Sequence, residues 1–156
     1  MATTTDGERR IEFYVRHELP APARDQSAAV YDRLCRLADR GVVSGIERHE
    51  WVGRVPLADC DRWLRDTYLG FTDWAGEAGV ALRPFFSTRE CYTPECEAYT
   101  DWLVLPALCL ALYEGGQLQA VYPHADGDET VTVAEAVDSL ERDTLEIPGT
   151  SPTPAD

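Results

Sequence analysis

The sequence contains no lysine: all 14 basic residues are arginine, against 28 acidic residues, so the net charge is −14. Carboxylates hold water and hydrated cations, which keeps an acid-rich protein soluble in concentrated salt. We therefore expect a haloarchaeal protein of the cytoplasm; the alternative is an acidic protein from a high-GC genome, whose codons favour arginine. The negative charge also argues against nonspecific binding to nucleic acid at ordinary salt. Molar salt weakens that argument, because it screens the phosphates from any protein.

The chain also lacks a long hydrophobic run. Its most apolar stretch, Trp102–Tyr122, begins with eleven uncharged residues, whereas a membrane-spanning helix needs about 20. No apolar signal segment opens the chain, since residues 1–9 are polar. We therefore expect no membrane partner.

Familiar catalytic motifs are missing as well. The sequence holds no GxSxG, no HExxH and no glycine-rich phosphate loop, which removes support for nucleophilic hydrolases, zinc peptidases and nucleotide-binding enzymes. We therefore expect a protein without catalytic activity.

What is present predicts a single α+β domain over residues 10–142, between disordered tails at 1–9 and 143–156. Alternating apolar residues favour strands and apolar residues three or four apart favour helices. The expected fold is a mostly antiparallel sheet of about five strands with helices packed on one face, in the order β-α-β-α-β-β-β-α and with a ferredoxin-like flavour. The expected elements are strands at 10–17, 42–52 and 80–87, a hairpin within 102–122, and helices at 25–41, 57–78 and 133–142, with a polar connection at 88–101.

Trp102–Tyr122 is expected to form the centre of the sheet. Gly115 and Gly116 interrupt the apolar pattern and predict the turn of a hairpin. Pro106 removes a backbone donor from its first strand. That strand should therefore carry a bulge at Pro106, or its first half, 102–105, should lie at an edge.

The five cysteines are an odd number without a secretory context, so reduced thiols are expected. Cys91 and Cys96 form the one paired-thiol spacing, and we expect them to be unligated thiols or to form a disulfide across this loop, with no cofactor. The alternative is a metal site made by Cys91, Cys96 and His124, for which zinc is the possible ion. The other three thiols lie on apolar faces and are expected to pack in the core: Cys35, Cys60 and Cys109.

Two further clusters can carry chemistry. His17 and His49 lie on two expected strands and can form an acid–base pair if those strands are neighbours; otherwise they are surface histidines. The acidic residues close to them in sequence are Glu18, Glu47 and Glu50. Residues 123–129 can hold a cation or form a solvated turn. The four tryptophans, Trp51, Trp63, Trp74 and Trp102, belong either to the core or to a ligand pocket.

Several stretches resemble a family of small haloarchaeal proteins catalogued as helix-turn-helix domain proteins. They are residues 13–16 (FYVR), 39–43 (DRGVV), Trp51, 83–86 (RPFF), 105–113 (LPALCLALY) and 122–124 (YPH). The resemblance implies a regulatory protein that binds DNA or a regulatory protein partner, with a homodimer as one expected arrangement. A small-ligand-sensing or protein-interaction module is the alternative function. A helix-turn-helix would require a break within 57–78, near 67–70, because a DNA-reading motif needs two helices joined by a short turn.

Overall fold

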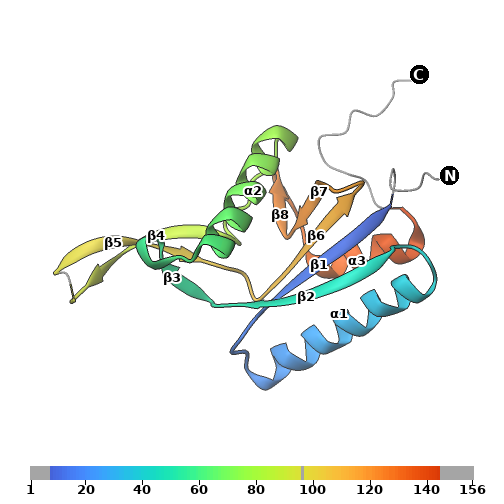
Figure 1. Cartoon of the computed structure of the whole chain (residues 1–156), viewed down its shortest axis with the longest axis horizontal. Helices are drawn as coiled ribbons and strands as arrows, with labels where there is room; N and C mark the ends of the chain where they lie inside the picture. Colours follow the sequence, from blue (N-terminus) through green and yellow to red (C-terminus); the bar gives the residue numbers. More distant parts are fainter. Residues whose placement is uncertain (1–7, 96, 145–156) are drawn as a thin grey trace.

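The computed structural model describes residues 8–95 and 97–144, which form three helices around a four-stranded sheet, with two smaller sheets beside it (Figure 1). The predicted tails fall almost entirely outside these residues. The elements are β1 (Arg9–Arg16), α1 (Ala21–Asp39), β2 (Gly45–Trp51), β3 (Arg54–Pro56), a 3₁₀ turn η1 (Leu57–Asp59), α2 (Arg62–Ala78), β4 (Ser87–Thr93), β5 (Ala98–Val104), β6 (Leu108–Glu114), β7 (Gln117–Tyr122), β8 (His124–Asp126), β9 (Glu129–Val131) and α3 (Val133–Arg142).

The main sheet has the strand order β2-β1-β6-β7. β1 and β2 run parallel and are joined by α1, whereas the other neighbours are antiparallel. The α+β class with mostly antiparallel strands is therefore confirmed. The topology differs from the ferredoxin-like arrangement, because β1 and β2 are direct neighbours and no strand is inserted between them.

Helices cover both faces of the main sheet, so the expectation of helices on one face was wrong. The Phe13 ring stacks on Tyr31 of α1, whereas the next residue, Tyr14, contacts Trp63 and Phe71 of α2. Consecutive strand residues point to opposite faces, and Figure 1 shows α1 and α3 on one side of the sheet and α2 on the other. A strict alternation of apolar and polar residues in β1 would place Tyr14 on the polar face, but Tyr14 is only 1% exposed.

α1 begins before its predicted start and ends where expected. Pro20 is its N-cap residue, and Pro22 lies in the first turn. A proline fits there because the first helical N–H groups have no intrahelical partner. At the other end, Gly41 has φ +80° and the amide of Val42 donates to the carbonyl of Leu37. This is the glycine-terminated helix end that the sequence predicts.

α2 is one continuous helix, and residues 57–59 before it form only the turn η1. The Asp61 carboxylate accepts a hydrogen bond from the Leu64 amide, and Gly79 ends the helix in the left-handed conformation. The helix passes through Gly70 without a break. The arrangement of two helices around a turn at 67–70 is therefore not formed.

The predicted hairpin within Trp102–Tyr122 was correct only in its second part. β6 and β7 pair around Gly115 and Gly116, which both have positive φ, as a tight hairpin turn requires. Trp102 belongs instead to β5 in a different sheet. The chain changes sheets at Pro106, where the carbonyls of Leu105 and Pro106 accept hydrogen bonds from the side chains of Arg16 and Trp51.

Two further predictions in the middle of the chain were wrong. Residues 80–87 contain one isolated bridge, between Ala81 and Ala125, followed by a turn that buries Phe86 against Trp51. The expected polar connection at 88–101 is instead the β4–β5 hairpin. With β3 it forms a three-stranded sheet, which we call the arm (residues 54–56, 87–93 and 98–104), and which extends away from the main sheet in Figure 1.

Candidate functional site

The parallel pairing of β1 and β2 brings together side chains that are more than thirty residues apart in sequence. In this register Glu12 lies opposite Glu47, and Tyr14 lies opposite His49. All four residues therefore share the face of the sheet that α2 covers around Tyr14. β2 is an edge strand, so this cluster is open to solvent along one side.

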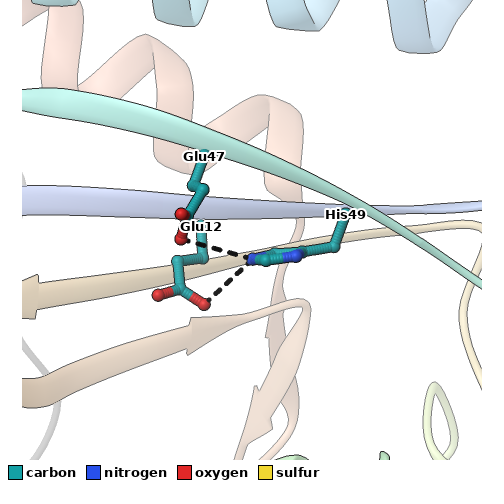
Figure 2. A group of neighbouring side chains, drawn as sticks. All are labelled: Glu12, Glu47 and His49. Carbon is teal, nitrogen blue, oxygen red and sulfur yellow. Dashed lines mark ion pairs between the residues drawn. The ribbon is translucent and has the colours of Figure 1, made fainter. Parts of the chain in front are cut away.

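Glu12, Glu47 and His49 converge on one point (Figure 2). The Nε2 atom of His49 lies 3.3 Å from Oε1 of Glu12 and 3.6 Å from Oε1 of Glu47. The three ligand atoms lie within 4.8 Å of one another, and in the described part of the chain no other group of three His, Cys, Asp or Glu side chains does so. We call this group the Glu12–Glu47–His49 cluster.

Glu12 is held as a carboxylate. Burial raises its pKa, but hydrogen bonds from Arg10 and Tyr14 outweigh burial, so that the net pKa is lowered. Arg10 donates to Oε2, and the Tyr14 hydroxyl donates to Oε1 over 2.9 Å. Burial also raises the pKa of Tyr14, which keeps its hydroxyl a donor. Oε1 of Glu12 is therefore fixed beside the imidazole as a negatively charged oxygen.

His49 is oriented by aromatic rings. Its ring stacks on Tyr14 at a centroid distance of 5.0 Å, and the ring of Trp63 from α2 lies 5.6 Å away. The Nε2 atom is buried and makes no hydrogen bond, although both carboxylates are within ion-pair distance. Buried polar atoms normally have a partner, so this nitrogen is available to a proton or a cation shared with the carboxylates.

The structure does not bring His17 and His49 together as an acid–base pair. The two strands are neighbours, as the prediction required, but His49 lies opposite Tyr14 and contacts Glu12 and Glu47, whereas His17 follows the end of β1 and contacts Glu50. Nδ1 of His17 is 3.3 Å from Glu50, and both side chains are about half exposed. Glu47 was among the residues that the sequence indicated, whereas Glu12 was missed. The sequence signal for Glu12 is its position two residues before Tyr14, which places both on the same face of the strand.

The residues of the predicted zinc site are only partly described. Cys91 lies half-buried on β4 of the arm with a free thiol. His124 is buried on β8, donates through Nδ1 to the Val121 carbonyl over 2.7 Å, and contacts the ring of Trp74. Cys96 lies outside the described residues, so zinc binding by Cys91, Cys96 and His124 stays a prediction.

The remaining predicted residues are divided between core and surface. Cys60 and Cys109 are buried, and burial raises the pKa of both thiols, whereas Cys35 is half-buried. Residues 123–129 form the β8–β9 hairpin. Among the tryptophans, Trp51 and Trp74 are buried, Trp102 is half-buried and Trp63 is 43% exposed.

The arm separates its charges between its two faces. Arg89 pairs with Trp102, and the guanidinium carbon of Arg54 lies 5.3 Å from the centre of the Trp102 ring. Because side chains alternate along strands, the other face carries the Glu90–Asp101 pair and the exposed Tyr92–Tyr99 ring pair. We call the first side, with Arg54, Arg89 and Trp102, the arginine face of the arm.

A hollow lies on the α1 side of the main sheet. It has a volume of about 330 Å³ and is lined by residues of α1 and the ends of β1 and β2, among them His17, Arg24, Tyr31, Arg48 and Glu50.

The described residues include no helix that is both long and apolar enough to cross a membrane.

Comparison with known families finds one match. A family model described as "Helix-turn-helix domain" matches residues 3–145, which is more than half of the chain. Comparison with curated proteins and with solved structures finds no match. Within the described residues, β2 and β3 separate α1 from α2, and strands β4 to β9 separate α2 from α3, so no two helices there are joined by a short turn.

Proposed function

Because the chain belongs to this helix-turn-helix domain family, we propose that it is a regulatory protein that binds DNA and has no catalytic activity. The observation that carries this proposal is the extent of the family match, which covers residues 3–145. The mode of binding must differ from two helices around a turn, since α2 is a single helix preceded by a strand.

The arginine face of the arm is the surface that best fits a contact with DNA. A β-ribbon has dimensions that the major groove accepts, and other DNA-binding proteins use strands in a groove. Arg54 and Arg89 are exposed there, while Glu90 and Asp101 lie on the opposite face. This arrangement presents positive charge locally although the whole chain carries −14.

A titration of genomic DNA fragments with the full chain, followed by fluorescence anisotropy at several KCl concentrations, tests the proposal. We expect salt-sensitive binding of some fragments. In the double variant Arg54→Gln/Arg89→Gln, the slope of log affinity against log salt should fall by about 2, because each lost phosphate contact removes about one unit.

The matched control is Arg24→Gln/Arg36→Gln, which removes two exposed arginines of α1 and should leave the slope unchanged. If no fragment binds at any salt concentration, DNA binding is wrong. If fragments bind and both double variants behave alike, the function stands but the contact surface lies elsewhere.

Small-ligand sensing is a second candidate function, favoured by the hollow beside α1. Its volume of about 330 Å³ is at the lower end of the range for ligand pockets, roughly 300–1,000 Å³. Three arginines, Arg16, Arg24 and Arg48, line it against the two carboxylates of Asp32 and Glu50, a balance that suits a small anionic ligand. A thermal-shift screen of anionic metabolites tests this candidate, and a Tm that no compound raises would contradict it.

A further inference from the structure

We propose that the Glu12–Glu47–His49 cluster binds one divalent transition-metal ion, and that Zn²⁺ fits it best. One imidazole nitrogen and two carboxylate oxygens are ligands that zinc accepts in proteins. This proposal does not depend on DNA binding, and it concerns residues other than the predicted cysteine site.

Two of the three spacings between the ligand atoms suit a tetrahedral ion, and the third, between the two carboxylate oxygens, is within 4.8 Å. Bonds of about 2.0–2.1 Å to nitrogen and oxygen separate neighbouring ligand atoms of a tetrahedron by about 3.4 Å. The two distances from Nε2 of His49 to the carboxylate oxygens are 3.3 and 3.6 Å. Glu47 is 62% exposed, so its side chain is free to adjust, and the fourth position of the ion remains for water.

The environment of the His49 Nε2 atom also points to a ligand. Nε2 of His49 is buried without a hydrogen bond, although it lies between two carboxylates. A metal ion would satisfy this atom and both oxygens together, which accounts for a buried polar atom that makes no hydrogen bond.

Arg10 has two opposite effects on the binding of an ion. Its guanidinium lies 3.8 Å from Oε1 of Glu47 and repels a cation. Glu12 and Glu47 carry two negative charges against this single positive charge, so the cluster with a neutral imidazole still has a net charge of −1. Arg10 also holds Oε2 of Glu12, and such a contact orients the other oxygen toward a metal.

Calorimetric titration of the EDTA-treated full chain with Zn²⁺ tests the proposal, with Co²⁺ absorption and tryptophan fluorescence as second readouts. We expect one ion at this cluster. The Co²⁺ complex should show visible bands without the intense near-ultraviolet absorption of a thiolate, and Co²⁺ should quench Trp63, whose ring lies 5.6 Å from that of His49.

His49→Asn and Glu47→Gln should each weaken the binding at least about tenfold, since even residues that only orient a ligand cost 10–100-fold. Glu47 is exposed, so Glu47→Gln keeps the test valid if His49→Asn fails to fold. His17→Asn and Glu50→Gln are the matched controls, because they alter an exposed histidine–glutamate pair at 3.3 Å on the other face, and they should bind as the wild type does.

Cys91→Ser/Cys96→Ser separates this cluster from the predicted cysteine site. Unchanged Zn²⁺ affinity in this variant, with loss in Glu47→Gln, supports the proposal. No binding by the wild type, a thiolate band, or loss only in the cysteine variant would overturn it.

Discussion

At the scale of single residues, Tyr14 on the face of β1 that meets α2 has both a buried ring and a polar contact. Tyr14 is buried among His49, Trp51, Trp63 and Phe71, yet its hydroxyl reaches the carboxylate of Glu12. Tyrosine suits this position because it has an apolar body and a polar tip. The same side chain therefore anchors the core and orients the cluster.

The lowered pKa of Glu12 predicts an acid-dependent loss of stability. Burial raises this pKa, but the hydrogen bonds from Arg10 and Tyr14 lower it by more than burial raises it, so folding favours the carboxylate. The stabilisation is present above the pKa of the unfolded chain and is lost as the pH falls through the lower pKa of the folded chain. Wild type should therefore lose stability more steeply than Glu12→Gln on acidification.

Urea unfolding with EDTA between about pH 6 and about pH 3 measures this difference. Glu18→Gln, a change at an exposed glutamate, is the control and should follow the wild type. Parallel pH profiles for wild type and Glu12→Gln would contradict the role assigned to Glu12.

At the scale of elements, the sequence predicted where the helices end better than it predicted which strands pair. Thr132 and Glu135 form a capping box at the start of α3, and Gly41 lies at the end of the expected first helix. These signals act within four residues, so the sequence displays them directly. The β4–β5 hairpin was missed, because its polar outer residues lack the apolar alternation of a half-buried strand.

α1 and α3 are joined by Arg33, which donates to Glu141 at 2.7 and 3.0 Å and also pairs with Asp138. Arg33→Gln should lower the free energy of unfolding by about 0.5–1 kcal/mol, as is usual for partly exposed ion pairs. The effect should shrink in molar KCl because salt screens the pair.

Urea unfolding at the lowest KCl concentration that keeps the wild type folded, and again in molar KCl, measures this effect. Arg36→Gln, which changes an exposed arginine of the same helix, is the control and should cost less. Equal losses in the two variants would show that the link between the helices adds nothing.

At the scale of the whole molecule, the charge of −14 predicts that salt stabilises the fold. Raising KCl from 0.1 to 1 M shortens the Debye length from about 10 to about 3 Å, which weakens repulsion among the carboxylates. The Tm measured by circular dichroism should therefore rise over this range. Sucrose at matched osmolarity is the control, because it acts by exclusion and not by screening; a Tm that does not rise with KCl would contradict the prediction.

The sequence by itself determined the composition, the C-terminal ends of the helices, the position of β1 and the glycine turn between β6 and β7. Each of these depends on residues close together in the chain. Only the tertiary structure decided that α2 covers the second face of the sheet, that Trp102 leaves the main sheet, and that Glu12 meets His49. Those features depend on strand register between segments 35 residues apart, and a shift of β2 by one residue would have placed Glu47 and His49 on the face opposite Glu12.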